Sequence, residues 1–180
     1  DRVLVVAKTL PEEGARGMSL FWVDAASPGF SRGRLLDKVG QRAQDTAELF
    51  FENVRVPVEN LLHEEGSGFA IAQARLGPGR IHHCMRALGA AERALALMID
   101  RVQNRIAFGK PLAEQGVVQQ QIALSRNEID QSRLLCHKAA WTIDQHGNQS
   151  REARQLVSMI KAVAPQMACN VIDRAIQVHG

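Results

Sequence analysis

Aromatic side chains are scarce in this 180-residue sequence: they make up 4% of it, and tyrosine is missing altogether. Single-stranded nucleic acids are bound by aromatic rings beside a positive groove, so nucleic acid is a poor candidate partner. Apolar runs are short, and Val3–Ala7 falls far below the ~18–20 residues that a membrane-spanning helix needs. We therefore expect neither a membrane span nor a signal-peptide core.

Cysteine is also scarce, and its pattern excludes two common kinds of site. Cys84, Cys136 and Cys169 are widely spaced and include no CxxC pair, which fits neither a disulfide framework nor a zinc site. His82, His83 and Cys84 are adjacent, but neighbours on a helix diverge by about 100° and cannot converge on one metal. The sequence therefore predicts a reducing compartment and no metal.

What remains is an ordinary globular composition, with 46% hydrophobic and 23% charged residues. The net charge of +3 is unevenly distributed: residues 1–65 carry 8 basic and 11 acidic side chains, and residues 66–180 carry 14 basic and 8 acidic ones. The basic residues of the second part are dispersed among acidic ones. This distribution favours a small anionic ligand over a polyanion.

Residues 1–65 have the alternation and turn residues of β structure. Because the connections are too short for helical crossovers, we expect antiparallel pairing. The alternation slips by one residue near Asn53, which indicates a bulge or bend there. The predicted strands are residues 3–9, 18–24, 32–38 and 47–56.

After residue 66 the hydrophobic period changes to that of helices, and three long ones are expected. The first spans about 67–104 with a kink or break at Gly77-Pro78-Gly79, the second runs from about 115 until Gly147, and Ser150 caps the third. Pro165 should bend the third helix without ending it, because its apolar stripe continues beyond the proline. The expected main apolar face of that helix consists of Leu156, Ile160, Val163, Met167, Val171 and Ala175.

These elements predict an α+β fold: a partial antiparallel β domain over residues 1–65, followed by a bundle of long antiparallel α-helices over residues 66–180. The sequence starts at Asp1, with no Met, directly before a strand pattern, and it stops at Gly180 just after a helical one, so we expect it to be a piece of a longer chain. The third helix also has apolar residues outside its main face, which predicts a second subunit there or cover from another domain. These residues are Val157, Met159, Ala162, Ala164, Ala168 and Ile172.

The connection Arg105-Ile-Ala-Phe-Gly-Lys-Pro-Leu112 carries the clearest chemical signal. It presents a guanidinium, an aromatic ring, a Gly-Lys pair and the start of a helix, which together suit a nucleotide phosphate. The alternative is a simple interhelical turn in which Gly109 is a helix C-cap and Phe108 is a hydrophobic plug.

This segment resembles the RxxFGK motif of the acyl-CoA dehydrogenases, and further matches follow in the family's order and spacing. They are Gly40–Thr46 for a GxRxSxT-type turn, Phe51–Pro57 for FxxVxVP, Glu65–Phe69 for GxGF, and Ile176–Gly180 for the first half of QxxGGxG. The segment Leu76–Cys84 resembles the subgroup whose longest members carry a phosphotransferase-like domain.

The resemblance implies an FAD enzyme that oxidises the Cα–Cβ bond of an acyl-CoA to the trans-2-enoyl-CoA, as in fatty-acid β-oxidation. It implies a homodimer or homotetramer in which a neighbouring subunit completes each FAD site, with an electron-transfer flavoprotein as acceptor. Arg80 would lie beside the thioester. Gln115 stands where the family often has a His or Phe before a Gln. The implied cofactor-binding residues are Arg105, Phe108, Gln115, Gln177 and Gly180.

The catalytic base is not identified by the resemblance. Some members carry it one residue before the arginine that Arg80 matches, but that position is Gly79, which cannot take a proton. Other members place the carboxylate after the QxxGGxG motif, so we expect the base beyond Gly180 and expect this piece of chain alone to be inactive.

Two other readings of the function stay open at this point. An acyl-CoA oxidase or related flavin enzyme would use the same scaffold, and a non-catalytic helical assembly module would need no FAD. The compartment is expected to be the cytoplasm of a bacterium, or the mitochondrion or peroxisome of a eukaryote.

Overall fold

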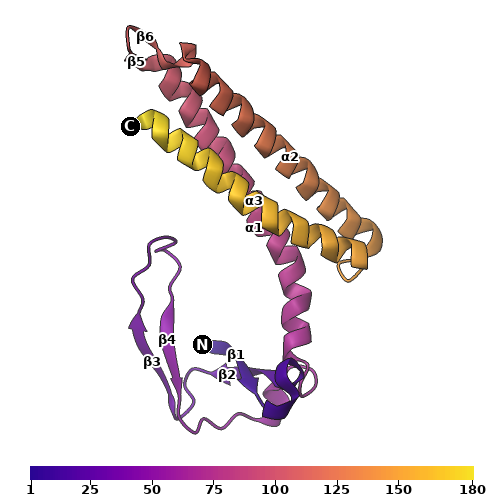
Figure 1. The fold of residues 1–180 in the computed structure, drawn as a ribbon. Helices are drawn as coiled ribbons and strands as arrows, with labels where there is room; N and C mark the ends of the chain where they lie inside the picture. Colours follow the sequence, from indigo (N-terminus) through magenta and orange to yellow (C-terminus); the bar gives the residue numbers. More distant parts are fainter. The chain divides into compact units, whose positions relative to one another are not determined.

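The computed structural model describes residues 1–180, which fold into two compact units, Asp1–Gln73 and Ala74–Gly180 (Figure 1). The first unit holds two separate two-stranded sheets, and the second is built from three long helices and a short hairpin. The helix α1 (Gly68–Asn104) begins in the first unit and continues through the second. The predicted α+β class is confirmed.

The strands of the first unit pair antiparallel, as predicted. β1 (Arg2–Lys8) and β2 (Met18–Asp24) pair along their full length, whereas β3 (Phe30–Leu35) and β4 (Ala47–Phe51) shift register between Arg32 and Leu35. The predicted strands 32–38 and 47–56 extend too far, because β3 ends at Leu35 and β4 ends at Phe51. The expected bend near Asn53 is present, because this residue has a left-handed backbone with φ of 51°.

The Gly-Ser-Gly segment before α1 is held against β2 by a buried serine. The Ser19 hydroxyl, on a fully buried residue, accepts a hydrogen bond from Gly66 N at 2.9 Å. Gly66 has φ of +81°, and a Cβ there would lie 2.3 Å from the Arg16 carbonyl oxygen. Only glycine fits this approach without displacing the backbone, which gives a physical reason for the first glycine of the motif.

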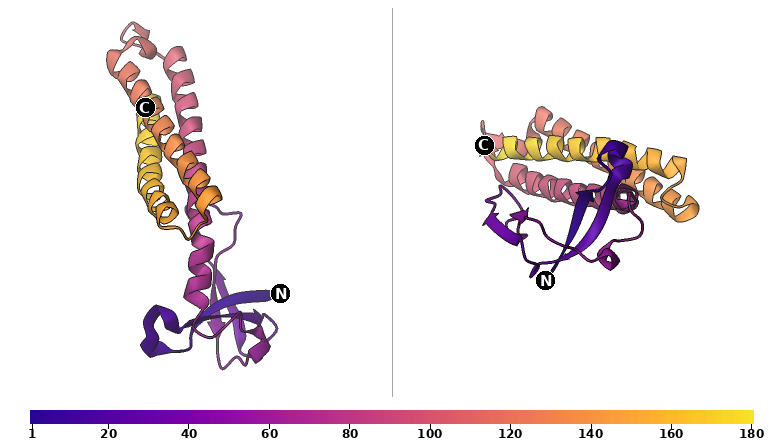
Figure 2. Two further views of the ribbon diagram at one scale, coloured as in Figure 1. Left: turned by 90° about the vertical axis from the view of Figure 1, so that its right-hand side faces the viewer. Right: turned by 90° about the horizontal axis from the view of Figure 1, so that it is seen from below.

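The helices of the second unit begin and end close to the predicted positions. α2 (Gly116–His146) is ended by Gly147 at φ of 77°, and α3 (Arg151–His179) begins where the Ser150 hydroxyl accepts a hydrogen bond from Ala153 N at 3.2 Å. Pro165 lies inside α3, and the helix continues beyond it to His179, as predicted. The end of α3 lies at the same end of the helical unit as the α1–α2 connection (Figures 1 and 2).

Of the kink or break expected at Gly77-Pro78-Gly79, the break is absent, because α1 continues through this segment as one helix. Proline has no N–H, so Pro78 leaves the carbonyl of Ala74 without its helical donor. The side-chain amide of Asn148, in the α2–α3 connection, donates to that carbonyl over a long 3.4 Å. A tertiary contact thus replaces the lost hydrogen bond.

The α1 helix and the two helices packed on it bury one continuous apolar core. The predicted face of α3 was partly wrong: Val163 is 43% exposed, whereas Val157, Ala164 and Ala168 are buried. Ile160, Ala164 and Val171 are completely buried in the core that α3 shares with α1 and α2. The buried face of α3 is therefore wider than one stripe, and part of the apolar excess predicted to need a partner is covered within the chain.

Ion pairs connect the helices at the edges of this core. Arg126 of α2 makes two bonds to the Glu92 carboxylate of α1, at 2.7 and 3.0 Å, and Arg133 also donates to that carboxylate. These guanidinium groups lower the pKa of Glu92 to about 2, chiefly through the hydrogen bond from Arg126. On α3, Arg174 makes a bidentate pair with Glu128 of α2, with both distances 2.8 Å.

We predict that Asn148→Ala weakens the helical unit by about 0.5–1.5 kcal/mol, the usual net value of one hydrogen bond. In a Pro78→Ala background the helix regains its own donor for Ala74, so the same change should cost much less. Urea unfolding of the four proteins, followed by helical circular dichroism, measures this coupling. An equal cost of Asn148→Ala in both backgrounds would show that the amide does not serve the Ala74 carbonyl.

Candidate functional site

The connection between α1 and α2 is a tight β-hairpin. β5 (Ile106–Ala107) and β6 (Lys110–Pro111) pair across a two-residue turn made by Phe108 and Gly109, which have φ of 55° and 80°. Positive φ at both central residues is the signature of a type I′ turn. Gly109 is therefore not a C-cap of α1, which ends at Asn104, and Phe108 is not a hydrophobic plug, because it is 94% exposed.

A cleft of about 360 Å³ lies beside this hairpin, where the ends of α1 and α3 meet the start of α2. Arg101 lies in the last turn of α1, Arg105 follows that helix directly, and Gln121 comes from α2. The last residues of α3 form the opposite wall, and Leu112 and Val118 contribute apolar surface. The α3 residues that line the cleft are Gln177, Val178, His179 and Gly180.

The cleft is electropositive and rich in hydrogen-bond donors. Two guanidinium groups and two carboxamides line it, and none of its lining residues is acidic. The Nε of Arg101 is buried without a hydrogen-bond partner, while its Nη2 donates to the His179 carbonyl at 3.2 Å. Buried donors are almost always bonded. The orphaned Nε and the absence of carboxylates in the lining fit a ligand that carries anionic or carbonyl oxygens, such as a dinucleotide.

The structure brings together three of the predicted cofactor residues, because Arg105, Gln177 and Gly180 all line this cleft. Phe108 lies at the hairpin tip and does not line it. Gln115 precedes the first residue of α2, where its side chain makes no capping bond, and it is also outside the cleft.

The predicted substrate residue lies far from these groups. Arg80 is half-buried on α1, well before the helix ends at Asn104. At about 1.5 Å of rise per residue, the stretch of helix between them is roughly 36 Å long. A Cβ built at Gly79 would meet only the Arg75 Nη1 atom, at 3.3 Å, so glycine is not required there by packing within the described residues.

Sequence reasoning missed Arg101, Gln121 and His179. Arg101 precedes Arg105 by four positions, about one helical turn, and this spacing could have revealed it. Gln121 and His179 carried no comparable signal, because their place in the cleft depends on how α2 and α3 pack.

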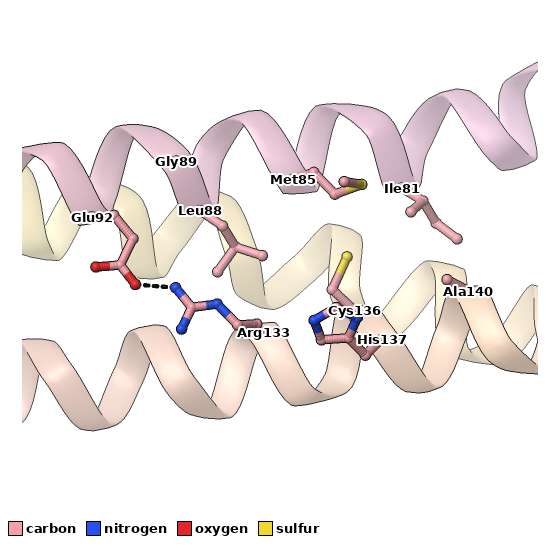
Figure 3. A pocket seen from close by; sticks show the side chains of 9 residues that line it. All are labelled: Ile81, Met85, Leu88, Gly89, Glu92, Arg133, Cys136, His137 and Ala140. Atoms are coloured by element: carbon pink, nitrogen blue, oxygen red, sulfur yellow. Dashed lines mark hydrogen bonds and ion pairs between the residues drawn. The ribbon is translucent and has the colours of Figure 1, made fainter.

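A second cavity, of about 330 Å³, lies between α1 and α2 (Figure 3). It is lined mainly by apolar side chains, among them Ile81, Met85 and Leu88, and the Glu92–Arg133 ion pair closes one end. Burial raises the pKa of the Cys136 thiol, another lining group, so this thiol is protonated and unreactive at neutral pH. No group of three or more potential metal ligands occurs anywhere in the chain. The cleft at the end of α3 is therefore the better candidate site.

Comparison with known proteins identifies the family. Residues 66–180 match the family model described as "Acyl-CoA dehydrogenase, C-terminal domain". The chain belongs to the acyl-CoA dehydrogenase family. It is 67% identical over 180 residues to the probable acyl-CoA dehydrogenase FadE2 of Mycobacterium tuberculosis, covering 99% of this chain and 44% of that protein.

Other acyl-CoA dehydrogenases are similar to this chain at lower sequence identity. Acyl-CoA dehydrogenase family member 10 of Mus musculus is 53% identical over 164 residues, which cover 90% of this chain and 15% of the mouse protein. The structure of butyryl-CoA dehydrogenase from Megasphaera elsdenii aligns with a TM-score of 0.88 and 37% identity, over 100% of this chain and 46% of that one.

This acyl-CoA dehydrogenase chain thus spans less than half the length of the relatives that it matches. Such relatives occur in both bacteria and eukaryotes. None of the helices described here has the length and apolar content required to cross a bilayer.

We predict that Phe108→Asn stabilises the hairpin by about 0.5–1 kcal/mol, because asparagine tolerates the left-handed backbone that phenylalanine adopts here at a cost. Phe108→Ala keeps the strain and removes only an exposed ring, so it should leave the free energy of unfolding nearly unchanged. Chemical denaturation of the three proteins distinguishes these effects. A loss of more than about 1 kcal/mol in Phe108→Ala would show that the ring packs within its own chain.

Proposed function

We propose that the cleft binds the diphosphate-containing half of FAD and that the protein oxidises an acyl-CoA to the trans-2-enoyl-CoA. The observation that carries this proposal is the convergence of Arg105, Gln177 and Gly180, which lie far apart in the sequence, on one electropositive cleft. Arginine presents a planar fork that matches phosphate oxygens. Membership of the acyl-CoA dehydrogenase family supports the cofactor and the reaction class.

In this reaction the Cα–H and Cβ–H bonds break and a double bond forms between the two carbons. A carboxylate base takes the α proton. FAD, when bound, supplies the acceptor for the hydride from Cβ. Gly79 has no group that can take a proton, so the base is another residue; Arg80 is proposed to lie beside the thioester.

We propose distinct roles for the residues that carry the cofactor site. Arg105 holds a phosphate, and Gln177 and Gly180 contact the diphosphate or ribityl region. Phe108 stands outside the cleft on an exposed hairpin tip, which suits stacking on an adenine held by another subunit. Gln115 is left out of this set because it does not line the cleft.

We also propose that residues 1–65 are the end of a middle β domain and residues 66–180 a helical domain, both belonging to a larger enzyme of fatty-acid oxidation. An electron-transfer flavoprotein is the proposed acceptor of the electrons.

The FAD proposal is tested by Arg105→Ala in the protein at its full natural length. Loss of one charge-assisted contact to phosphate is worth about 1.5–3 kcal/mol, so FAD should bind roughly 10- to 100-fold more weakly. FAD content and its dissociation constant measure the effect, and Arg154→Ala, an exposed arginine near the start of α3, is the matched control. Unchanged FAD affinity in Arg105→Ala would contradict the proposal.

The proposed assembly is a homodimer or a dimer of dimers, with α3 and the Arg105–Leu112 connection at the interface. Met159 and Val163 lie one turn apart on α3 and are 45% and 43% exposed. Covering such side chains contributes roughly 25 cal/mol for each Å² removed from water.

Light scattering of the full-length protein should therefore show a dimer or tetramer at micromolar concentration. Val163→Glu should dissociate it, because a carboxylate would be buried without a partner. Ser158→Glu, on another side of α3, should leave it assembled. A monomeric wild-type protein would contradict the proposal.

A further inference from the structure

The C-terminal end of α3 is fastened to α1 by a side chain. The last carbonyls of a helix have no partner within the helix, and those of α3 lie at the cleft. The His179 ring donates from Nδ1 to the Ala175 carbonyl at 2.8 Å, and Arg101 of α1 donates from Nη2 to the His179 carbonyl at 3.2 Å. Gly180 follows with φ of 95°, so the chain leaves the helical conformation at this point.

We infer that Arg101 is a positioning residue, which holds the Gln177–Gly180 wall of the cleft beside Arg105. This inference rests on the proposed function, since it concerns the same cleft. Arg101 lies in the last turn of α1 and Arg105 follows that helix directly, with Arg105 N donating to the Arg101 carbonyl at 2.9 Å. The two arginines differ in surroundings: Arg105 is exposed, whereas Arg101 is half-buried and already bonded to α3.

The attachment depends on few contacts, which makes it sensitive to substitution. The Arg101 guanidinium makes one hydrogen bond to α3, and its Nε is buried without a partner. On the other wall, the Gln177 amide has only a loose 3.5 Å contact with Asp173 of its own helix. Without Arg101, therefore, no side-chain hydrogen bond would join the last turn of α3 to α1.

Electrostatics gives Arg101 a second contribution at the same place. Both α1 and α3 end at the cleft, and each helix C-terminus carries a partial negative charge of about half an electron that disfavours a bound anion. The Arg101 charge, placed on the His179 carbonyl, offsets the α3 end directly. A substitution that keeps the positive charge and one donor should therefore preserve most of its effect.

The experiment uses the full-length protein with its flavin removed and ADP as the probe for the diphosphate-containing half of FAD. Arg101→Met keeps the length of the apolar stem but loses donor and charge, Arg101→Lys keeps a donor and the charge, and Arg93→Met is the control at another arginine of the same helix. Calorimetry gives the ADP dissociation constant. Hydrogen exchange measured without ligand reports the order of residues 175–180.

Arg101→Met should bind ADP about tenfold more weakly and exchange the amides of residues 175–180 at least tenfold faster than the wild type. Arg101→Lys should recover both properties to within about threefold. Arg93→Met should change neither. The exchange measurement contains no ligand, so a residue that acts only by contacting the bound anion would not alter it.

Weaker ADP binding in Arg101→Met with unchanged exchange would overturn the positioning role and make Arg101 a direct ligand. If Arg101→Met changes neither the ADP affinity nor the hydrogen exchange of residues 175–180, Arg101 has no role in the cleft. Failure of both the wild type and Arg93→Met to bind ADP would overturn the proposed function and, with it, the cofactor role of Arg101. Failure confined to the Arg101 variants leaves the proposed function standing.

Discussion

The burial of α3 in the angle between α1 and α2 is the constraint on which the helical unit depends. Three alanines of the core, Ala91, Ala139 and Ala164, are completely inaccessible, and they come from all three helices. Small residues at such positions let helix backbones approach closely, and a larger side chain would force the helices apart or off their rotamers. The distance between the walls of the cleft is set by this packing, because one wall belongs to α3.

Apolar packing alone does not fix the position of α3 along the axis of its neighbours, and the Arg174–Glu128 ion pair supplies that constraint. Arg174 donates two parallel hydrogen bonds to the Glu128 carboxylate, and this geometry tolerates little shift along the helix axis. Arg174 also donates to the hydroxyl of buried Ser125 at 3.2 Å. The net stabilisation from such partly exposed pairs is modest. The main effect of the pair is to fix the position of α3 along its axis. Arg174 lies less than one turn before Gln177, so this constraint acts close to the cleft.

Helix positions could be predicted from the sequence because their signals are local. The apolar period, the Ser150 cap and the Gly147 stop each act over a short stretch of chain, and all three helices were placed close to their observed ends. Pro78 does not break α1, and the donor that replaces its missing N–H is Asn148, which lies in the connection between the other two helices. No local pattern reveals a rescue of that kind.

The candidate site also combines residues that the sequence indicated with an arrangement that depends on packing. Arg105, Gln177 and Gly180 were predicted from a family resemblance, and their meeting in one cleft is a consequence of packing that periodicity alone could not show. The hairpin was missed because phenylalanine is a poor residue for its turn: Asn-Gly would have signalled a type I′ turn, whereas Phe-Gly does not. Val163 was misplaced because α3 buries a wide face shared between two neighbours, not one stripe.

Phe108 is an unfavourable residue for its turn, and this observation bears on the function of the hairpin. Phe108 has φ of 55°, a strained conformation for phenylalanine, and it is 94% exposed. Its own chain therefore offers it neither a relaxed backbone nor burial of the ring. Natural sequences break such local rules mainly where function requires it. The strained hairpin fixes the ring outside the cleft, while Arg105, directly before β5, belongs to the cleft wall. In the proposed function, this short connection presents a charge to one region of the cofactor and an aromatic face to another, and the turn between them fixes the spacing.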